Sequence, residues 1–381
     1  MNPFRSLLIT ATSLALTATT AYAEPKVITS IKPVHSLVAA VMDGVGEPEL
    51  IIEGASSPHT YSLKPSQAAS LQEAEIIFWV GPQLEAFLEK PINSIAGNAK
   101  SVALIESHGL IKLPFREGGA FEAHNHDDHA HEQHEEHEHD KHAHEKHEEH
   151  GHDEHAHEKH EEHEEHAHEK HEEHEHNDHA HEKHEEHEHD EHAHEKHEEH
   201  EHDDHGHGEF DAHLWLDPVN AKAFLHEIEE VLVATDPGNA ARYEANAKQM
   251  SEKLDQLIHD ATHMLEPVRT QEFVVFHDAY QYFEKRFGLN ATGSITVNPD
   301  VRPGAERIRE IQKQVKSLKA GCVFSEPQFD PKLVSVILEG TNAKTGALDP
   351  LGASIQPGAD MYLQLIEKMA ASMKACLSPS S

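Results

Sequence analysis

The chain has 381 residues, with 31 Lys and Arg against 70 Asp and Glu, so its formal net charge is −39 when His is counted as neutral. Nucleic-acid binding and attachment to a membrane surface through a basic face both need a positively charged footprint, which this composition argues against. The length suggests two domains rather than one. A second anomaly is the number of His residues, which is 41.

One segment, residues 122–208, carries most of both anomalies. Its 87 residues include 33 His, 35 Asp and Glu and six Lys, a net charge of −29, and its only apolar residues are seven Ala. The rest of the chain is about 46% apolar, which is ordinary for a globular protein. The segment has no apolar stripe that could offset the entropy of ordering it, so we expect disorder or at most transient helix.

The N-terminus has the pattern of a secretory signal peptide. Arg5 supplies a positive charge, residues 7–18 form a short apolar stretch, and small residues at positions 21 and 23 surround Tyr22. This pattern predicts cleavage after Ala23 and export of a soluble protein to the periplasm. A membrane anchor is the alternative, but the stretch is too short to cross roughly 30 Å of hydrocarbon.

Between residue 24 and the His-rich segment, short β-rich runs alternate with helical patterns. The expected strands are 27–31, 49–52, 76–80 and 101–105, and the expected helices are 35–43, 65–74 and 82–90. Alternation of this kind indicates a parallel sheet with crossover helices.

A long helical stretch, 236–266, follows an expected helix at 218–233. Its apolar residues recur at alternating spacings of four and three, which indicates one continuous buried stripe. A second alternating unit comes next. Its expected strands are 273–276, 293–297, 321–324 and 345–348, and its expected helices are 279–287, 304–319, 331–338 and 359–375.

These patterns predict an α/β fold with two lobes, each with a parallel-type sheet flanked by helices, joined by a long rigid helix. The expected divisions are a signal peptide at 1–23, an N-terminal lobe at 24–235 that contains the 122–208 insert, the connecting helix at 236–266 and a C-terminal lobe at 267–381.

The His-rich insert is typical of a metal-binding tract, because neutral imidazole is a common ligand for Zn²⁺, Cu²⁺ and Ni²⁺. The heptapeptide HEKHEEH occurs five times in it, and its spacing places imidazoles on one side whenever the chain turns helical. Metal capture here should weaken below about pH 6 as the imidazoles protonate. A solvated acidic spacer is the alternative. The auxiliary candidate ligands are His144, His147, His150, His157, His160, His163 and the other His of 122–208.

A second set of candidate ligands lies where predicted strands end, which is where open α/β sheets bind their ligands. His59 follows the second strand, His213 lies just after the insert, His277 ends the strand that begins at 273, and Asp349 follows the strand 345–348. Three imidazoles would give Zn²⁺ three ligands and leave a fourth position for Asp349 or water. The remaining His outside the insert have the default interpretation of a hydrogen-bonded or solvated side chain, and these are His35, His108, His226, His259 and His263.

Only two Cys are present, Cys322 and Cys376. An even pair in an exported chain favours a disulfide. Two metal-binding thiolates are the alternative, although neither residue belongs to a CxxC motif.

Four segments of the chain resemble the zinc-specific branch of the cluster A-I metal-binding proteins, the ZnuA-type periplasmic components of ABC uptake transporters. They are SPHTYSLKPS at 57–66, HLWLDP at 213–218, FHDAY at 276–280 and LDPLG at 348–352, in the order found in the family. A loop rich in His and acidic residues just before the second segment is itself typical of this branch.

The resemblance implies two α/β lobes, a long connecting helix and a metal in the cleft. His59, His213 and His277 match the three zinc-ligating His of the family, and Asp349 matches the position where manganese-type relatives use a carboxylate ligand. Those relatives carry Glu in place of His277, and softer imidazole there favours zinc. The two Cys residues match a family disulfide.

Two positions depart from the pattern. Some zinc-binding members have a Glu immediately before the first His, whereas this chain has Pro58, which excludes a carboxylate ligand from that position. Some also have a His near the strand 293–297 that contributes to an auxiliary site, and here Ser294 occupies the matching place.

The leading hypothesis is high-affinity zinc capture in the periplasm by a monomer without catalytic activity. Zinc would pass to an inner-membrane ABC permease with its cytoplasmic ATPase, the insert would collect or sense zinc, and an auxiliary periplasmic zinc chaperone is a further candidate partner. One alternative is a zinc hydrolase, for which Glu326 and Asp278 are the nearby carboxylates that we nominate. No HExxH motif is present, which argues against this alternative. The other is a storage protein for Zn, Ni or Cu whose insert is its whole function.

Overall fold

The computed structural model describes residues 24–116, 121, 210–296, 304–318, 321–329 and 331–379. The expected signal peptide at 1–23 and the expected His-rich insert at 122–208 lie outside the described residues. In the part that is described, no helix has the length and apolar character needed to cross a membrane.

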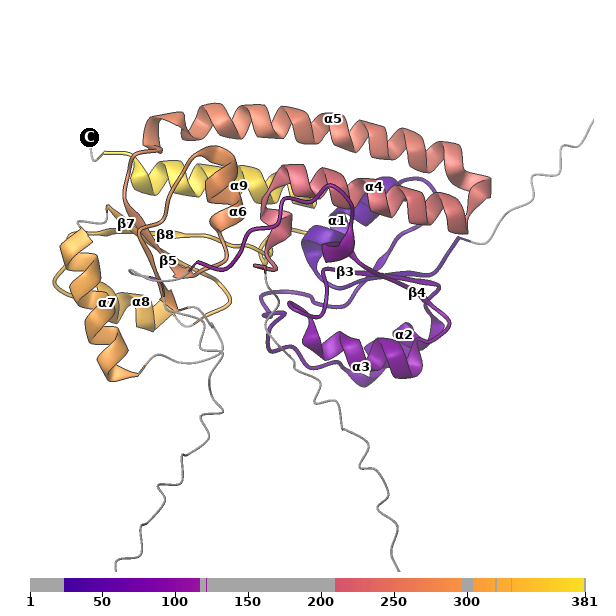
Figure 1. Ribbon diagram of the computed structural model, residues 1–381, viewed down its shortest axis with the longest axis horizontal. Helices are drawn as coiled ribbons and strands as arrows, with labels where there is room; N and C mark the ends of the chain where they lie inside the picture. Colours follow the sequence, from indigo (N-terminus) through magenta and orange to yellow (C-terminus); the bar gives the residue numbers. More distant parts are fainter. Residues whose placement is uncertain are drawn as a thin grey trace, which may run out of the picture. The chain divides into compact units, whose positions relative to one another are not determined.

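The first half of the described chain builds a four-stranded parallel sheet in the order β2-β1-β3-β4 (Figure 1). The two inner strands are buried along their whole length and apolar except for Thr29, as expected of strands covered on both faces. The strands are β1 (Val27–Thr29), β2 (Glu49–Leu50), β3 (Ile76–Trp79) and β4 (Lys100–Ala103), and the helices between them are α1 (Lys32–Val41), α2 (Pro65–Glu73) and α3 (Ala86–Ile95).

The second half repeats this plan, with a parallel sheet in the order β6-β5-β7-β8. The predicted α/β class with two parallel sheets is therefore confirmed. The strands are β5 (Phe273–His277), β6 (Gly293–Thr296), β7 (Cys322–Ser325) and β8 (Lys344–Ala347), and the helices are α6 (Gln281–Phe287), α7 (Ala305–Leu318), α8 (Pro331–Leu338) and α9 (Met361–Leu377).

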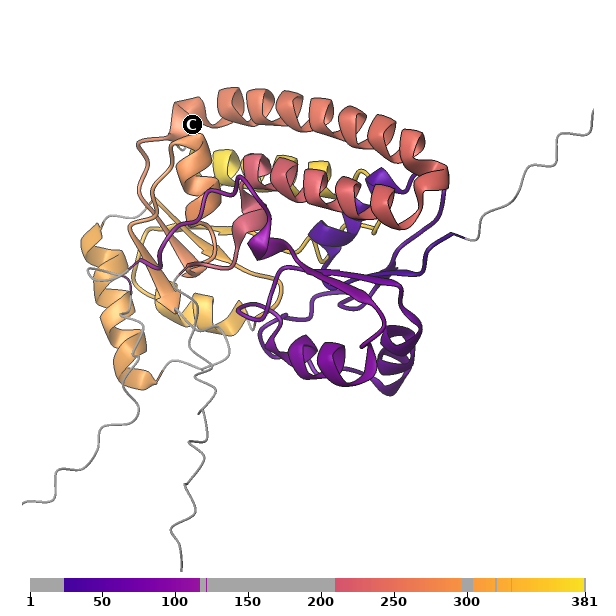
Figure 2. The ribbon, with the colours of Figure 1, turned by 45° about the vertical axis from the view of Figure 1, so that its right-hand side comes forward.

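Two long helices lie between these sheets in sequence, α4 (Pro218–Thr235) and α5 (Ala240–Leu265). They lie side by side in both views (Figures 1 and 2), and α5 also packs against α1 from the first half and α9 from the second. The predicted helix 236–266 differs at its start, where Pro237–Asn239 forms a separate 3₁₀ turn before α5. At the other end Pro267 lies in a second 3₁₀ turn, Glu266–Val268.

The start of α3 also differs from the predicted helix 82–90. The carboxylate of Glu85 accepts hydrogen bonds from the backbone N–H of Val80 (3.3 Å) and Gly81 (2.9 Å). These bonds hold residues 81–85 in a turn, so the helix begins only at Ala86 and continues to Ile95.

One apolar core runs from the first sheet through α4, α5 and α9 to one face of the second sheet. Alternate residues of β5 divide between two cores, because successive side chains of a strand point to opposite faces. Phe273 and Val275 join the main core, whereas Val274 and Phe276 join a smaller one under α7 and α8. A disulfide between Cys322 of β7 and Cys376 of α9, with Cα atoms 5.9 Å apart, confirms the predicted pair.

A buried lysine fastens the loop after β8 to the first half of the chain. Lys32, at the start of α1, is 5% exposed. Its Nζ donates to the carbonyl oxygens of Gly352 (3.1 Å), Ala353 (2.9 Å) and Ile355 (3.1 Å). Trp215 Nε1 donates to the carbonyl of Pro350 in the same loop, at 2.8 Å. These contacts fix the loop that begins at the predicted ligand position 349.

The Lys32→Met substitution removes the three donors and leaves three carbonyl oxygens of the loop without them. We expect the free energy of unfolding to fall by about 3 kcal/mol, because buried acceptors left without partners are costly. Urea denaturation measures this change. The matched control is Lys26→Met, whose ammonium forms a solvent-exposed ion pair with Glu73 and should change stability little. Equal stability loss in the two variants would contradict the assigned role of Lys32.

Glu85 gives a pH-dependent contribution to stability. Burial raises the pKa of this carboxyl to about 7, against hydrogen bonds from Ser30 Oγ and backbone N–H groups that favour the ionised form. Because its pKa is raised in the folded state, the protonated Glu85 carboxyl contributes about 3 kcal/mol to the free energy of unfolding. This contribution is fully present below the unfolded pKa near 4.5 and is lost as the pH rises through about 7.

Residue 85 cannot titrate in the Glu85→Gln variant. The free energy of unfolding of the wild type minus that of the variant should therefore fall as the pH rises from 4.5 to 8. Denaturant unfolding at several pH values measures this difference, in which the titration of the many His residues cancels. Glu252→Gln on the exposed surface of α5 controls for loss of a charge alone. A difference that is constant with pH would contradict the raised pKa.

Candidate metal centre

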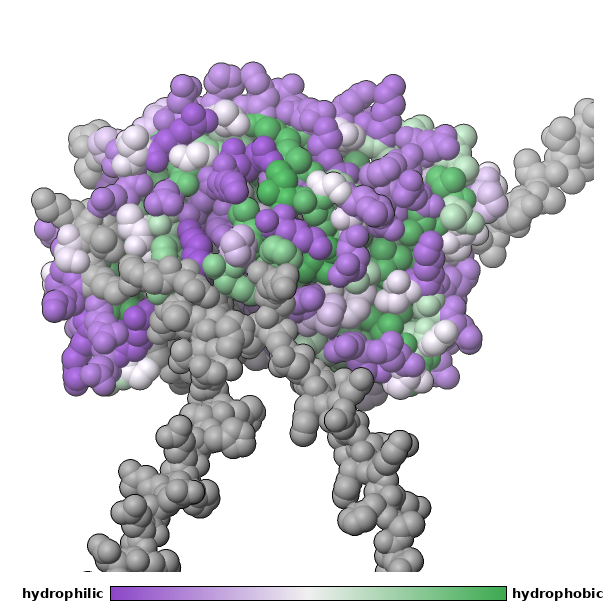
Figure 3. All heavy atoms as spheres, viewed as in Figure 1, coloured by the Kyte–Doolittle hydropathy of each residue, from purple (hydrophilic) through white to green (hydrophobic). Residues whose placement is uncertain are grey.

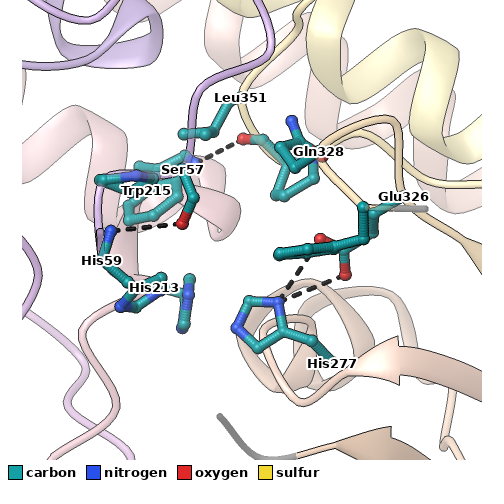
Figure 4. A pocket seen from close by; sticks show the side chains of 11 residues that line it. Ser57, His59, His213, Trp215, His277, Glu326, Gln328 and Leu351 are labelled. Atoms are coloured by element: carbon teal, nitrogen blue, oxygen red, sulfur yellow. Dashed lines mark hydrogen bonds and ion pairs between the residues drawn. The ribbon is translucent and has the colours of Figure 1, made fainter. Parts of the chain in front are cut away.

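Three imidazoles from separate segments meet at the carboxyl ends of the strands. His59 lies in the loop after β2, His213 begins the 3₁₀ turn Leu214–Leu216, and His277 is the last residue of β5. One ring nitrogen of each lies within 4.8 Å of the others. The ring centroids are 4.9 Å apart for His213 and His277, and 5.5 and 5.7 Å from His59 to these two rings. Figure 4 shows the three side chains pointing toward one another.

The orientation of the His213 ring is set by Asp211, two residues earlier. His213 Nδ1 lies 2.6 Å from Asp211 Oδ1, and the same oxygen accepts the backbone N–H of His213 at 2.9 Å. Gln281 Nε2 donates to the other carboxylate oxygen at 2.6 Å. With Nδ1–H donating to Asp211, Nε2 is the nitrogen left to bind a metal.

Asp211 is fully buried, and burial by itself would raise its pKa. The charge of His213 and the hydrogen bonds from His213 and Gln281 outweigh burial and hold the pKa of the carboxyl below its usual value. The group is therefore a fixed negative charge directly behind the ring, and it fixes the orientation of the imidazole.

Glu326 plays the equivalent part for His277. Its carboxylate oxygens lie 3.3 and 3.5 Å from His277 Nδ1, and both side chains are buried. Burial acts to lower the pKa of His277, but the charge of Glu326 and its hydrogen bond outweigh burial and raise this pKa above its usual value. The surroundings of His277 therefore favour a positive charge, including one carried by the protonated ring.

The space enclosed at the three rings is about 20 Å³. That volume accommodates a single ion or water molecule. Three neutral imidazoles with an open fourth position suit Zn²⁺, which prefers nitrogen and sulfur ligands in tetrahedral geometry. The walls around the rings are mostly apolar or neutral, and the lining residues besides the three His and Glu326 are Ser57, Pro58, Trp215, Gln328, Phe329, Pro350 and Leu351.

Asp349 is not among the residues whose ligand atoms gather at the three rings. Its carboxylate accepts hydrogen bonds from Gln328 Nε2 (2.9 Å), the Leu351 N–H (3.2 Å) and the Ala353 N–H (2.6 Å). These bonds shape the loop after β8. That Asp349 is the fourth metal ligand stays a prediction.

The other predicted His residues stand apart from the three rings. His35 is buried, with Nε2 3.1 Å from the carbonyl of Pro48, while His108, His226, His259 and His263 are exposed. The auxiliary candidates His144, His147, His150, His157, His160 and His163 lie outside the described residues.

Sequence reasoning did not assign the two carboxylates behind the rings. Asp211 could have been found from its spacing, because a residue two positions before a ligand His can accept from its ring. Glu326 was noted because it follows a strand and was nominated as a carboxylate of a hydrolase, but not as the partner of His277. Gln281 and Arg116 gave no local signal. Arg116 forms ion pairs with Asp278 and, at 2.8 Å, with Glu284.

The paired parallel sheets and the three converging imidazoles define an α/β protein with a candidate site for a transition-metal ion. A family model described as the periplasmic component A of zinc-uptake complexes, ZnuA, matches residues 27–376. The chain belongs to this family, whose members are substrate-binding proteins and not enzymes.

Curated relatives cover almost the whole chain. The chain is 51% identical over 352 residues to the high-affinity zinc uptake system protein ZnuA of Brucella suis biovar 1, covering 92% of this chain and 91% of the relative. It is 32% identical to the protein of the same name from Yersinia pestis, covering 93% and 92%.

Solved structures share the fold. A zinc-bound ZnuA with residues 138–173 deleted matches with a TM-score of 0.63 and 19% identity, over 94% of this chain and all of that chain. The periplasmic zinc binding protein TroA from Treponema pallidum matches with a TM-score of 0.62 and 16% identity, also over 94% and 100%.

The Asp211→Asn substitution tests the role of the carboxylate behind His213. The amide keeps the size of the side chain but loses the charge, so the dissociation constant for Zn²⁺ should rise about 10- to 100-fold. Competition with a chromophoric chelator measures the affinity of the tight site. Asp255→Asn, which removes a surface ion pair with Lys222 on α4, is the matched control and should leave the affinity unchanged. Unchanged affinity in Asp211→Asn would show that the ring needs no charged partner.

Proposed function

We propose that the chain captures Zn²⁺ in the periplasm through His59, His213 and His277 and delivers it to an ABC permease for uptake. The observation that carries the proposal is the convergence of three imidazoles within 4.8 Å in a site of single-ion size. The family membership and the names of the curated relatives support zinc uptake as the process.

His213 and His277 bind through Nε2 in this proposal, because carboxylates hold Nδ1 of both rings. Water completes a tetrahedral site. Asp349 is the alternative fourth ligand, but it would have to exchange some of the three hydrogen bonds that hold its carboxylate in the loop. Three imidazoles favour zinc over manganese, which prefers oxygen ligands.

The insert 122–208 collects or senses zinc for this site. The described residues that flank it lie beside the ligands and support this part of the proposal. The Asp211 N–H donates to the carbonyl of Leu113 at 2.9 Å, so the two flanking segments are paired. Arg116 binds Asp278, the neighbour of His277, and Asp211 binds His213. Metal held by the insert would be released next to the cleft.

The proposed partner proteins follow from the proposed role in zinc uptake. Delivery requires an inner-membrane permease with its cytoplasmic ATPase, and an auxiliary periplasmic zinc chaperone is a further proposed donor. We propose that the protein acts as a soluble monomer after cleavage of the signal peptide at Ala23.

The two carboxylates nominated for the alternative function of a zinc hydrolase already have partners in the structure. Glu326 binds His277, and Asp278 binds Arg116. A carboxylate in such a pair is poorly placed to activate water.

Deleting residues 122–208 separates capture in the cleft from storage in the insert. We expect the deleted chain to bind one tight equivalent of Zn²⁺ by calorimetry, and a His59→Ala/His277→Ala version of it to bind none tightly. The matched control is His226→Ala, which removes an exposed His of α4 and should keep the tight equivalent. Loss of tight binding on deletion alone would overturn the assigned site and favour storage in the insert.

A further inference from the structure

Two further imidazoles share one face of α5. His259 and His263 are one helical turn apart in the sequence HDATH, and residues four apart on a helix are neighbours on its surface. Their ring centroids are 4.5 Å apart, with the ring planes at 77°. Both side chains face solvent, and that of His263 is 64% exposed. Figure 3 shows mainly hydrophilic residues over α5.

The spacing is that of helical His pairs that bind zinc, since i and i+4 place both rings over the same side. Glu266 adds a carboxylate, with its Oε2 4.0 Å from His263 Nδ1. The pair lies close to the C-terminal end of α5 at Leu265, where the helix dipole favours a cation. Ligand type, spacing and local field therefore all favour a bound cation.

Neighbouring carboxylates on α5 have other partners. Asp260 accepts a hydrogen bond from Gln256 at 2.9 Å, and Asp255 pairs with Lys222 of α4 at 2.5 Å. The candidate ligands are therefore the two imidazoles. None of these residues belongs to the group formed by the three rings of the cleft.

We propose that His259 and His263 form a second, solvent-exposed binding site for a divalent transition metal of the Zn²⁺, Cu²⁺ or Ni²⁺ class. Water completes the coordination, and the Glu266 carboxylate adds negative charge beside His263. Imidazole ligands discriminate against Mg²⁺ and Ca²⁺, which prefer oxygen. The site binds more weakly than the cleft, because it has fewer preorganised ligands and is open to water.

A metal bridging two turns stabilises the end of α5 against local opening, which gives the site a readout separate from total metal content. Amide hydrogen exchange of the segment 254–268 in the full-length chain, measured by mass spectrometry at buffered free Zn²⁺, follows this opening. At a free concentration ten times the dissociation constant of the site, exchange should slow about tenfold.

The variants separate this site from the others. In a His259→Gln/His263→Gln chain the zinc-dependent slowing should disappear, whereas His226→Gln, an exposed His of α4, should retain it. A His59→Ala/His277→Ala chain should also retain it, because the α5 site does not depend on the cleft. The proposal is overturned if zinc leaves exchange in this segment unchanged, or if exchange slows equally without the two imidazoles.

Discussion

The arrangement of His213 and His277 against two buried carboxylates is the interaction on which the rest of the site depends. A ring with Nδ1 bonded to a carboxylate presents Nε2 in a fixed direction, and the two rings here lie with centroids 4.9 Å apart. Without Asp211 and Glu326 the rings could rotate, and ordering them would reduce the free energy of metal binding. The buried negative charges also offset the cost of bringing a divalent cation into a site with apolar walls.

The fold delivers these groups by combining parallel strands with a core common to both halves. His277 continues the row of Phe273 and Val275 on β5, whose packing against the main core fixes the strand. His213 follows the segment that pairs with Leu113 and leads into α4. Lys32 and Trp215 join the loop after β8 to the first half of the chain. The three candidate ligands therefore stand on elements held by one continuous packing arrangement, which favours a preformed site.

Much of this fold follows from local patterns in the sequence. The α5 stripe was predicted from spacings of four and three, and the structure buries Tyr243, Met250 and Leu254 accordingly. His277 could be placed because a strand-end position is visible in the sequence. The start of α3 could not, because it depends on a hydrogen-bonded turn around a buried carboxylate.

The partners of the ligands were also beyond local reasoning, since Glu326 and Gln281 meet their targets only through the folding of distant segments. Asp349 was predicted as a ligand because it lies at a strand end. That position does not show whether its carboxylate faces the metal or the loop. Periodicity identifies which residues reach the edge of a sheet, and it does not say which hydrogen bonds they make there.

The most direct test of the account is a crystal structure of the zinc complex with anomalous scattering at the zinc absorption edge. We expect one cleft peak about 2.0–2.1 Å from a ring nitrogen of His59 and from Nε2 of His213 and His277. Nδ1 of His213 and His277 should remain bonded to their carboxylates, with water as the fourth ligand. Zinc bound through Nδ1 of His213 or His277, or a cleft peak lacking any of the three rings, would contradict it.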